Sequence, residues 1–329
     1  MSIINRGDSS KPLRLLSIFE RLNQGKILNK AEEAERFSVD KKTIQRDIKE
    51  IRNYFVGAYN YNDKIKLIYD RKKKGYRLKR EDSSWLTQKE ILAISKVLLE
   101  SRSFNEAEMN QLLDKLILQA EPEERKHITE VIKSERFYYN PLEHGKDLFE
   151  VIWDFSKAVR EKKVVEVDYI KATSSEVKKR CLKPVGVIFS EFYFYLIAYI
   201  CDSDLDFPIV YRLDRIQNYE IKAERFRIPY VKDFKEGEFR KRVQFMYTGK
   251  LMNIKFKFWG RSIEAILDRL PTAEIVAQED DKYIVKAEVY GEGIKMWLLS
   301  QAEYLEVIEP LSFRKEMKET VEKMMGNYN

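Results

Sequence analysis

The sequence holds only two cysteines and two histidines in 329 residues. Two thiols are too few for a disulfide framework or a thiolate zinc site, and we expect Cys181 and Cys201 to be ordinary buried thiols. His127 falls in a charged helical stretch and His144 in a loop, positions that favour a surface or capping role over metal binding or catalysis. No metal site and no cofactor are therefore expected.

Long apolar runs are also missing. No stretch approaches the roughly 18–20 apolar residues that a membrane span needs, and the N-terminal MSIINRGDSSKPLR has no apolar core of a signal peptide. We therefore expect a cytoplasmic protein without membrane contact. No H-E-x-x-H, G-x-S-x-G, Walker or D-x-D pattern occurs in a fitting context, so we expect no enzyme and assign no catalytic residue.

Charge is abundant and unevenly placed. Residues 1–80 hold 21 Lys and Arg against 10 Asp and Glu, a net of +11, whereas the remainder holds 40 against 44, a net of −4. Hydrophobic residues make up 44% of the chain, enough to build cores, and the length favours two or three domains. The asymmetry indicates that the N-terminal part meets a polyanion; a solvated basic face is the alternative.

Three helices are predicted in the first sixty residues. The segment RLLSIFERLNQG places four apolar residues on one face, namely Leu15, Leu16, Phe19 and Leu22. A shorter helix, KAEEAERF, follows Asn29 and presents Ala31, Ala34 and Phe37. The third begins at the N-cap Asp40, runs from Lys41 to about Phe55, and carries the stripe Ile44, Ile48, Ile51 and Phe55. A short link before an amphipathic basic helix is the layout of a helix-turn-helix.

The polar face of the third helix predicts contact with DNA. A helix fits the major groove, and side chains near its start reach base edges. We expect base contacts from Thr43, Gln45 and Arg46, and phosphate contacts from Lys41, Lys42 and Lys49. Asp47 is expected to be a structural partner, because phosphate repels a carboxylate.

A β-hairpin is predicted next, with arms KIKLIYD and GYRLKR around a cationic tip. The tip residues Arg71, Lys72, Lys73 and Lys74 can lie on the phosphate backbone or in the minor groove; solubility is the alternative role. SVDKKTIQRDIKEI followed by IYDRKKKGYRL resembles the winged helix-turn-helix of DeoR-type bacterial regulators. The resemblance implies a DNA-binding domain over residues 1–82, with Asp40 where the family usually has Ser.

Residues 83–145 are predicted to form a helical linker. DSSWLTQKEILAISKVLLESRSFNEAEMNQLLDKLILQA gives two helices, and Thr87 with Glu90 forms a capping box at the first. These helices either join domains or pair with those of a second chain. Pairing is favoured, because DNA readers of this type act as symmetric dimers on inverted repeats.

From about residue 147 the sequence pattern changes from helices to one helix followed by several strands. A helix, LFEVIWDFSKAVREKK, precedes the strands VVEVDYI, VKKRCLKPVGVIFS, FYFYLIAYICD and IVYRLDRIQNYEI. This pattern predicts a small, strongly bent sheet with one helix, an Sm/SH3-like β-barrel over residues 146–230. Cations recur in the strands, and Asp168 and Asp214 could pair with them, so internal salt bridges are an alternative to a ligand site.

FYFYLIAY and YRLDRI resemble the WYL domain, with Phe194, Tyr195 and Leu196 in place of its signature. The resemblance implies a sensor of an anionic effector, a nucleotide or nucleic-acid fragment. Five residues are expected to line or support its pocket: Tyr169, Arg180, Tyr195, Arg212 and Arg215. Asp214 is expected to pair with one of the arginines. Ile209 stands where the family often has another Arg.

Residues 244–327 alternate strand, helix, strand, strand and helix, which predicts a ferredoxin-like α+β domain. The segment resembles the C-terminal extension that accompanies WYL domains. The whole multidomain α+β chain is thus expected to be a dimeric transcriptional regulator that reads an inverted-repeat operator. Repression and activation are both open, and repression is the outcome we expect. The alternatives are an RNA or single-stranded nucleic-acid binding protein that stacks bases on Phe192 to Tyr195 and, less favoured, a nucleic-acid-processing enzyme.

Overall fold

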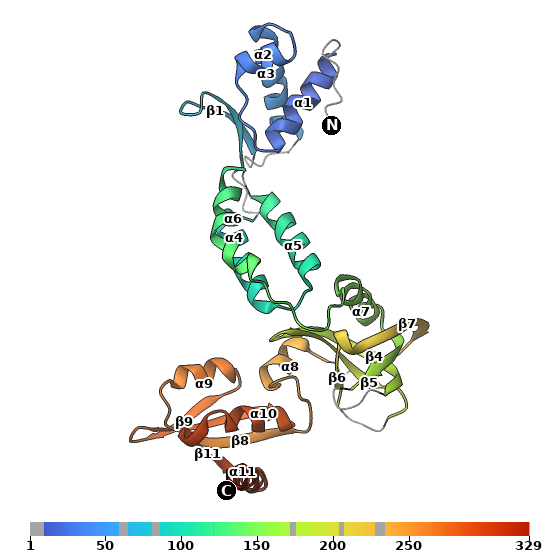
Figure 1. Cartoon of the computed structure of the whole chain (residues 1–329), viewed down its shortest axis with the longest axis vertical. Helices are drawn as coiled ribbons and strands as arrows, with labels where there is room; N and C mark the ends of the chain where they lie inside the picture. The colour runs from blue at the N-terminus through green and yellow to red at the C-terminus, as the bar shows by residue number, and fades with distance from the viewer. Residues whose placement is uncertain are drawn as a thin grey trace. The chain divides into compact units, whose positions relative to one another are not determined.

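The computed structural model describes residues 10–58, 65–80, 86–120, 122–171, 176–203, 207–227 and 234–328. The chain divides into two compact units, Met1–Arg102 with Glu106–Asn140 and Ser103–Asn105 with Pro141–Asn329 (Figure 1). The first unit is helical with one β-hairpin, and the second holds two antiparallel sheets with their helices. None of the helices in the described ranges is long and apolar enough to cross a membrane.

The first unit begins with three helices and a hairpin: α1 (Lys11–Asn23), α2 (Lys30–Arg36), α3 (Lys41–Ala58), β1 (Ile65–Asp70) and β2 (Gly75–Arg80). The stripe predicted for α3 is buried: Ile44, Ile48, Ile51 and Phe55. In α1 the prediction was wrong for Leu16, which is 63% exposed. The buried face instead carries Arg14, Ile18 and Leu22 at a spacing of four. An arginine in the core position hid this stripe from a search for apolar residues.

Three further helices follow in the same unit: α4 (Gln88–Ser101), α5 (Glu106–Gln119) and α6 (Pro122–Phe137). The predicted capping box of α4 is present, since the Thr87 N–H donates to Glu90 Oε2 at 2.7 Å and the Glu90 N–H donates to Thr87 Oγ1 at 3.3 Å. Fully buried Ile91, Leu113 and Ile132 come one from each helix. The three helices therefore share an apolar core.

The first sheet of the second unit has the order β6-β5-β4-β3-β7, and all its neighbours are antiparallel. Its strands are β3 (Lys163–Ile170), β4 (Val177–Ser190), β5 (Tyr193–Ile200), β6 (Ile209–Arg212) and β7 (Ile216–Arg225). Helix α7 (Phe149–Glu161) covers one face with Phe155 and Ala158 (Figure 1).

The prediction of a closed barrel was wrong. The edge strands β6 and β7 are joined by the short helix η1 (Leu213–Arg215) but do not pair with each other in the described ranges. Strand β6 has only four residues and pairs with β5, while β7 pairs with β3. The two edge strands are thus separated by only the three residues of η1 in the sequence, which indicates a strongly bent sheet. The sheet nevertheless stays open.

The two cysteines are bonded to each other, which corrects the expectation of two ordinary thiols. Cys181 lies in β4 and Cys201 directly follows β5, and their Cα atoms are 5.4 Å apart. The spacing of twenty residues gave no sign of this, because only the pairing of β4 with β5 brings the two together.

The second sheet has the order β11-β8-β10-β9 and is also antiparallel. Its elements follow the chain as β8 (Leu251–Phe258), α9 (Ile263–Arg269), β9 (Glu274–Glu279), β10 (Lys282–Tyr290), α10 (Gly291–Leu299), η3 (Ala302–Tyr304), β11 (Leu305–Glu309) and α11 (Leu311–Gly326). Its core combines residues of β8 and β10 with Ile266 of α9, Trp297 of α10 and Phe313 of α11.

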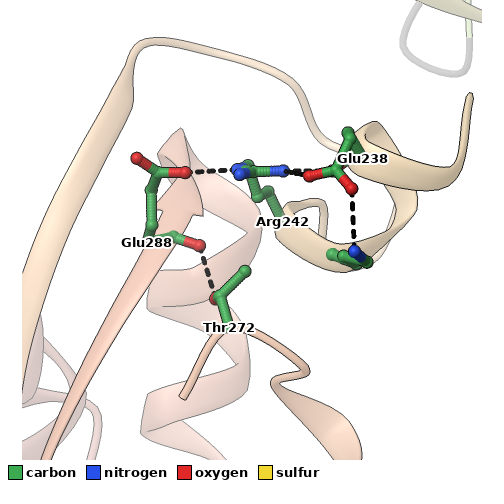
Figure 2. Close-up of polar contacts among 5 residues, drawn as sticks. Glu238, Arg242, Thr272 and Glu288 are labelled. Carbon is green, nitrogen blue, oxygen red and sulfur yellow. Dashed lines mark hydrogen bonds and ion pairs between the residues drawn. The ribbon is translucent and has the colours of Figure 1, made fainter. Parts of the chain in front are cut away.

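Helix α8 (Glu236–Arg242) lies between the two sheets in the sequence and contacts both. Its Phe239 packs with Ile188 and Ile197 of the first sheet. At its end, Arg242 forms an ion pair with Glu288 of β10 and another with Glu238 one turn earlier, at 2.7 Å (Figure 2). The hydrogen bonds from Lys241 and Arg242 lower the pKa of Glu238 to about 2.

Candidate functional site

Helix α3 presents a cationic face. Asp40 caps its first turn by accepting the Thr43 N–H at 2.6 Å, as predicted, and this hydrogen bond lowers the pKa of the Asp40 carboxyl. Five of the six α3 residues expected to touch DNA are exposed, namely Lys41, Lys42, Gln45, Arg46 and Lys49, whereas Thr43 is half-buried. The exposed residues all lie in the first half of α3, where a helix inserted into a groove makes its contacts.

A buried ion pair fixes the opposite face of α3. Arg14 of α1 donates through Nε to Asp47 Oδ2 at 2.5 Å and through Nη2 to Oδ1 at 3.3 Å. Asp47 is 1% exposed and is thus the structural partner that the sequence suggested. A second pair links α1 to α2, because both carboxylate oxygens of buried Glu33 accept from Arg21.

Gln45 is held by two neighbours that the sequence did not reveal. Its Oε1 accepts from Lys30 Nζ at 2.9 Å and from the Tyr76 hydroxyl at 3.3 Å. Lys30 begins α2 and Tyr76 lies in β2, so the contact joins three elements. Lys30 thereby adds a cation beside the face of α3. No sequence pattern marked it, because the three residues meet only in the fold.

The hairpin tip carries the four predicted cations, and all of them are exposed. Asp70 closes the tip by accepting the backbone N–H groups of Lys72 and Lys73 at 3.0 and 3.1 Å, and the bond from Lys73 lowers the pKa of its carboxyl. Asn29 donates to the Lys74 carbonyl at 3.1 Å and ties the tip to the start of α2. A side chain at Gly75 would place its Cβ 2.4 Å from Ile27, so this close approach requires glycine.

A second candidate site is a hollow of ≈ 260 Å³ at one end of the first sheet. Tyr169, Arg180 and Arg215 line it, as expected of them. Two further cations that the sequence analysis did not assign, Lys171 and Lys178, also line it. Their alternation in the strands could have suggested them, since Lys178 lies two residues before Arg180 on the same face of β4.

The hollow has an excess of positive charge. Lys178 is 3.2 Å from the carboxylate of Glu176. Within the described ranges no ion pair involves Lys171, Arg180 or Arg215, and Arg180 Nη1 donates to the Lys179 carbonyl at 3.2 Å. Unpaired guanidinium and ammonium groups around a concave surface suit an anion, which guanidinium groups can bind in a bidentate manner.

Tyr195 and Arg212 do not line this hollow. They face each other across β5 and β6, in register, whereas their neighbours Tyr211 and Leu196 belong to the core cluster of the sheet. Tyr211 lines the hollow as well, whereas Arg212, the next residue of β6 and on the other face of the strand, does not. The five predicted effector residues are therefore split between two faces.

Arg212 is engaged within the protein. Its Nε and Nη2 donate to Asp214 Oδ1 and Oδ2 at 3.0 and 2.6 Å, so the expected pairing of Asp214 with an arginine is present. The guanidinium also lies 3.3 Å from the centre of the Tyr193 ring. Burial raises the pKa of neighbouring Tyr195 to about 12. In the sequence analysis, internal salt bridges were the alternative to a ligand site, and the Arg212–Asp214 pair is such a salt bridge. Arg212 therefore stabilises the sheet and is not free to bind a ligand.

Two parts of the second unit match known domain families. Residues 150–221 match the WYL domain, and residues 251–325 match the WCX domain. The chain therefore contains a WYL domain, which includes the basic hollow, followed by a WCX domain. Among the described residues no group of three or more His, Cys, Asp or Glu side chains is placed to hold a metal ion.

Solved structures give distant similarities. The proteasome accessory factor B/C (PafBC) of Arthrobacter aurescens is 13% identical, with 98% of this chain and 49% of that chain covered and a TM-score of 0.30. A CRISPR Cas-related protein is 14% identical, with 100% and 88% covered and a TM-score of 0.35. The chain spans about half the length of the first. A comparison with curated proteins found no match.

Proposed function

We propose that the protein is a homodimeric, sequence-specific DNA-binding transcriptional repressor that senses an anionic effector. In this proposal residues 1–82 are a winged helix-turn-helix of the DeoR type that binds an inverted-repeat operator. Helices α4 to α6 hold the dimer together. The basic hollow of the WYL domain binds the effector, a nucleotide or an oligonucleotide.

The observation that carries the proposal is the division of α3 into two faces. Its inner face is fixed by the isoleucine stripe and by the buried Arg14–Asp47 pair, so the helix cannot turn its cations inward. Its outer face exposes Lys41, Lys42 and Arg46 over the first two turns. A rigid helix with such a face fits the major groove, where Arg can bind guanine through two hydrogen bonds.

The hairpin supports the same proposal. Its cationic tip is tied to α2 through Asn29, and β2 is bonded to Leu28 through the backbone of Tyr76. The tip is therefore held at a fixed position relative to α3. Lysines that only made the protein soluble would not need a fixed position. A fixed wing of four cations can contact phosphates beside the groove that α3 enters.

The charge of the hollow supports the proposed effector role. Four cations surround it, and only Lys178 has an ion pair in the described ranges. The adjoining tyrosines, Tyr169 and Tyr211, pack edge to face at 5.0 Å and are buried, so they form a wall and do not offer a stacking surface. The hollow thus favours the phosphate part of a nucleotide or oligonucleotide.

Binding of the full-length protein to DNA upstream of its own gene tests the proposal. Anisotropy titrations would use labelled duplex fragments, with single-stranded RNA of the same length as a second arm. Arg46→Ala should weaken specific binding by about 1–3 kcal/mol and relax the base preference at one position of each half-site. Lys323→Ala, which removes an exposed cation of α11 outside the proposed DNA, dimer and effector regions, is the control and should change nothing. Tighter binding of RNA than of any duplex would contradict the proposal.

A further inference from the structure

The two cysteines lie at a defined point of the first sheet. The β4–β5 ladder runs from Ser190 opposite Tyr193 to Leu182 opposite Ile200. Cys181 and Cys201 are the next facing residues, and the Cys201 N–H donates to the Cys181 carbonyl at 2.9 Å. The disulfide therefore closes the ladder at the end where β5 stops.

Beyond this bond the two strands separate. Residues 177–180 of β4 pair with β3 and lie beyond the described ladder with β5, whereas β5 ends at Ile200 and the next strand along the chain, β6, begins at Ile209. The basic hollow lies at this divergence. One wall carries Lys178 and Arg180 from the beginning of β4, and the other carries Ile200 and residues 209–211. Arg180 and Ile200 each directly precede a cysteine.

The side chains of both cysteines are half-buried and so within reach of small reagents. Lys179 and Lys183 lie two residues to either side of Cys181, on its own face of β4. Nearby cations favour the thiolate form, which is the form that reacts. The neighbour of Cys181 on β3 is Glu166, whose carboxylate is paired with Lys222 at 2.9 Å.

We propose that Cys181 and Cys201 form a reversible thiol–disulfide switch that sets the separation of the two walls of the hollow. The proposal rests on the proposed effector function, since it adds a redox control to the same site. In the oxidised form the bond holds the Arg180 end of β4 against β5. In the reduced form the cross-link is gone, and the backbone hydrogen bond between Cys201 and Cys181 alone joins that end to the chain after β5, so the hollow can widen.

The chemistry requires a low-molecular-weight disulfide as the oxidant. One cysteine thiolate attacks a sulfur of this disulfide and expels one small thiolate, and the second cysteine thiolate attacks the mixed disulfide and expels the other. The protein loses two electrons and forms one S–S bond. The small disulfide gains the two electrons and is released as two thiols, which carry the two protons of the cysteines.

The test uses the full-length chain, reduced with dithiothreitol or oxidised with glutathione disulfide. Alkylation of free thiols followed by intact mass measurement gives the state of the pair. Fluorescence anisotropy with a labelled hexathymidylate then gives the affinity of the hollow. The oxidised form has preorganised walls and should bind about fivefold more tightly or better. Cys201→Ser should show the affinity of the reduced parent under both conditions.

Two results would overturn the switch: no disulfide under glutathione disulfide, or equal affinity of the two forms. If neither form binds the oligonucleotide, the effector proposal fails on its own. Hydrogen–deuterium exchange of residues 177–180 then decides the switch. If reduction makes the exchange of these residues faster in the parent but not in Cys201→Ser, the disulfide controls this wall of the hollow. If reduction leaves the exchange unchanged, the switch is overturned.

Discussion

The Arg14 guanidinium and the Asp47 carboxylate form a buried two-point ion pair between α1 and α3, with Nε 2.5 Å from Oδ2 and Nη2 3.3 Å from Oδ1. The side chains are 7% and 1% exposed. Asp47 directly follows Arg46 on the helix. Because Asp47 is fixed toward the interior, Arg46 is held toward the solvent. The pair therefore links the stability of the N-terminal domain to the orientation of its proposed DNA-reading face.

Loss of one partner should destabilise this domain strongly. Asp47→Ala leaves Arg14 buried without its counter-charge, which costs about 3–5 kcal/mol. Hydrogen–deuterium exchange of α1 and α3 measures the change. The matched control is Lys11→Ala, because Lys11 and Glu50 join the same two helices at 2.6 Å but are 55% and 47% exposed. An exposed pair contributes about 0–1 kcal/mol, so equal costs in the two variants would show that burial of the Arg14 pair is not decisive.

The hairpin tip should contribute affinity without specificity. Lys72→Ala removes one phosphate contact, so it should weaken binding to all duplexes alike and reduce the slope of log K against log salt by about 1. Titrations at several salt concentrations, on operator and scrambled DNA, measure both effects. A loss confined to the operator would mean that the tip reads bases.

Much of the N-terminal domain could be predicted because its signals are local. The N-cap Asp40, the stripe of α3 and the four-cation turn each depend on residues close in sequence. Arg14 was missed for the opposite reason. A charged residue at a core position is only recognisable once its partner, 33 residues away, is placed beside it.

The proposed effector site was predictable only in part. Tyr169, Arg180 and Arg215 line the hollow as expected. They could be assigned together because the sequence resembles the WYL domain at these positions. Arg212 was assigned to the same set, although strand alternation places it on the other face from Tyr211. The open sheet and the disulfide were also missed, since both depend on which strands pair at the edges and at the ladder ends.

Dimer symmetry should appear in the operator. Two copies of α3 related by a two-fold axis should require inverted half-sites separated by whole helical turns. Insertion of about 5 base pairs between the half-sites turns one of them to the opposite side of the duplex and should weaken binding. Anisotropy titrations on the two fragments, with light scattering of the free protein, check this. A monomer at micromolar concentration would contradict it.

The hollow and the Arg212 pair should respond differently to mutation. Arg180→Ala and Arg215→Ala should leave folding and operator affinity close to those of the parent but remove the change that an oligonucleotide produces. Arg212→Ala should instead destabilise the WYL domain, because it leaves Asp214, 7% exposed, without its partner. Operator affinity with and without a hexathymidylate, beside thermal unfolding, separates the effects. Normal modulation in both hollow variants would mean that these cations are not an effector site.

His144 should give the second unit a pH dependence of stability below neutrality. Its Nδ1 accepts the Lys146 backbone N–H at 3.1 Å, so protonation of Nδ1 would break this hydrogen bond. Burial lowers the pKa of His144 below its usual 6.5, and the nearby charges of Arg212 and Lys146 add to this, while Asp214 opposes it. The folded state thus favours the neutral ring. Its contribution to stability is complete above about pH 6.5 and is lost as the pH falls through the lower pKa of the folded state.

The expected result is a melting temperature of the second unit that falls between pH 7 and 5, followed through the fluorescence of its tryptophans, Trp153, Trp259 and Trp297. His144→Gln keeps an acceptor but cannot gain a charge, so it should flatten this fall. The matched control is His127→Gln, since His127 is exposed on α6 and is the other histidine of the chain. Equal pH profiles for the parent and His144→Gln would show that the carboxylates of the unit, and not this imidazole, set its acid stability.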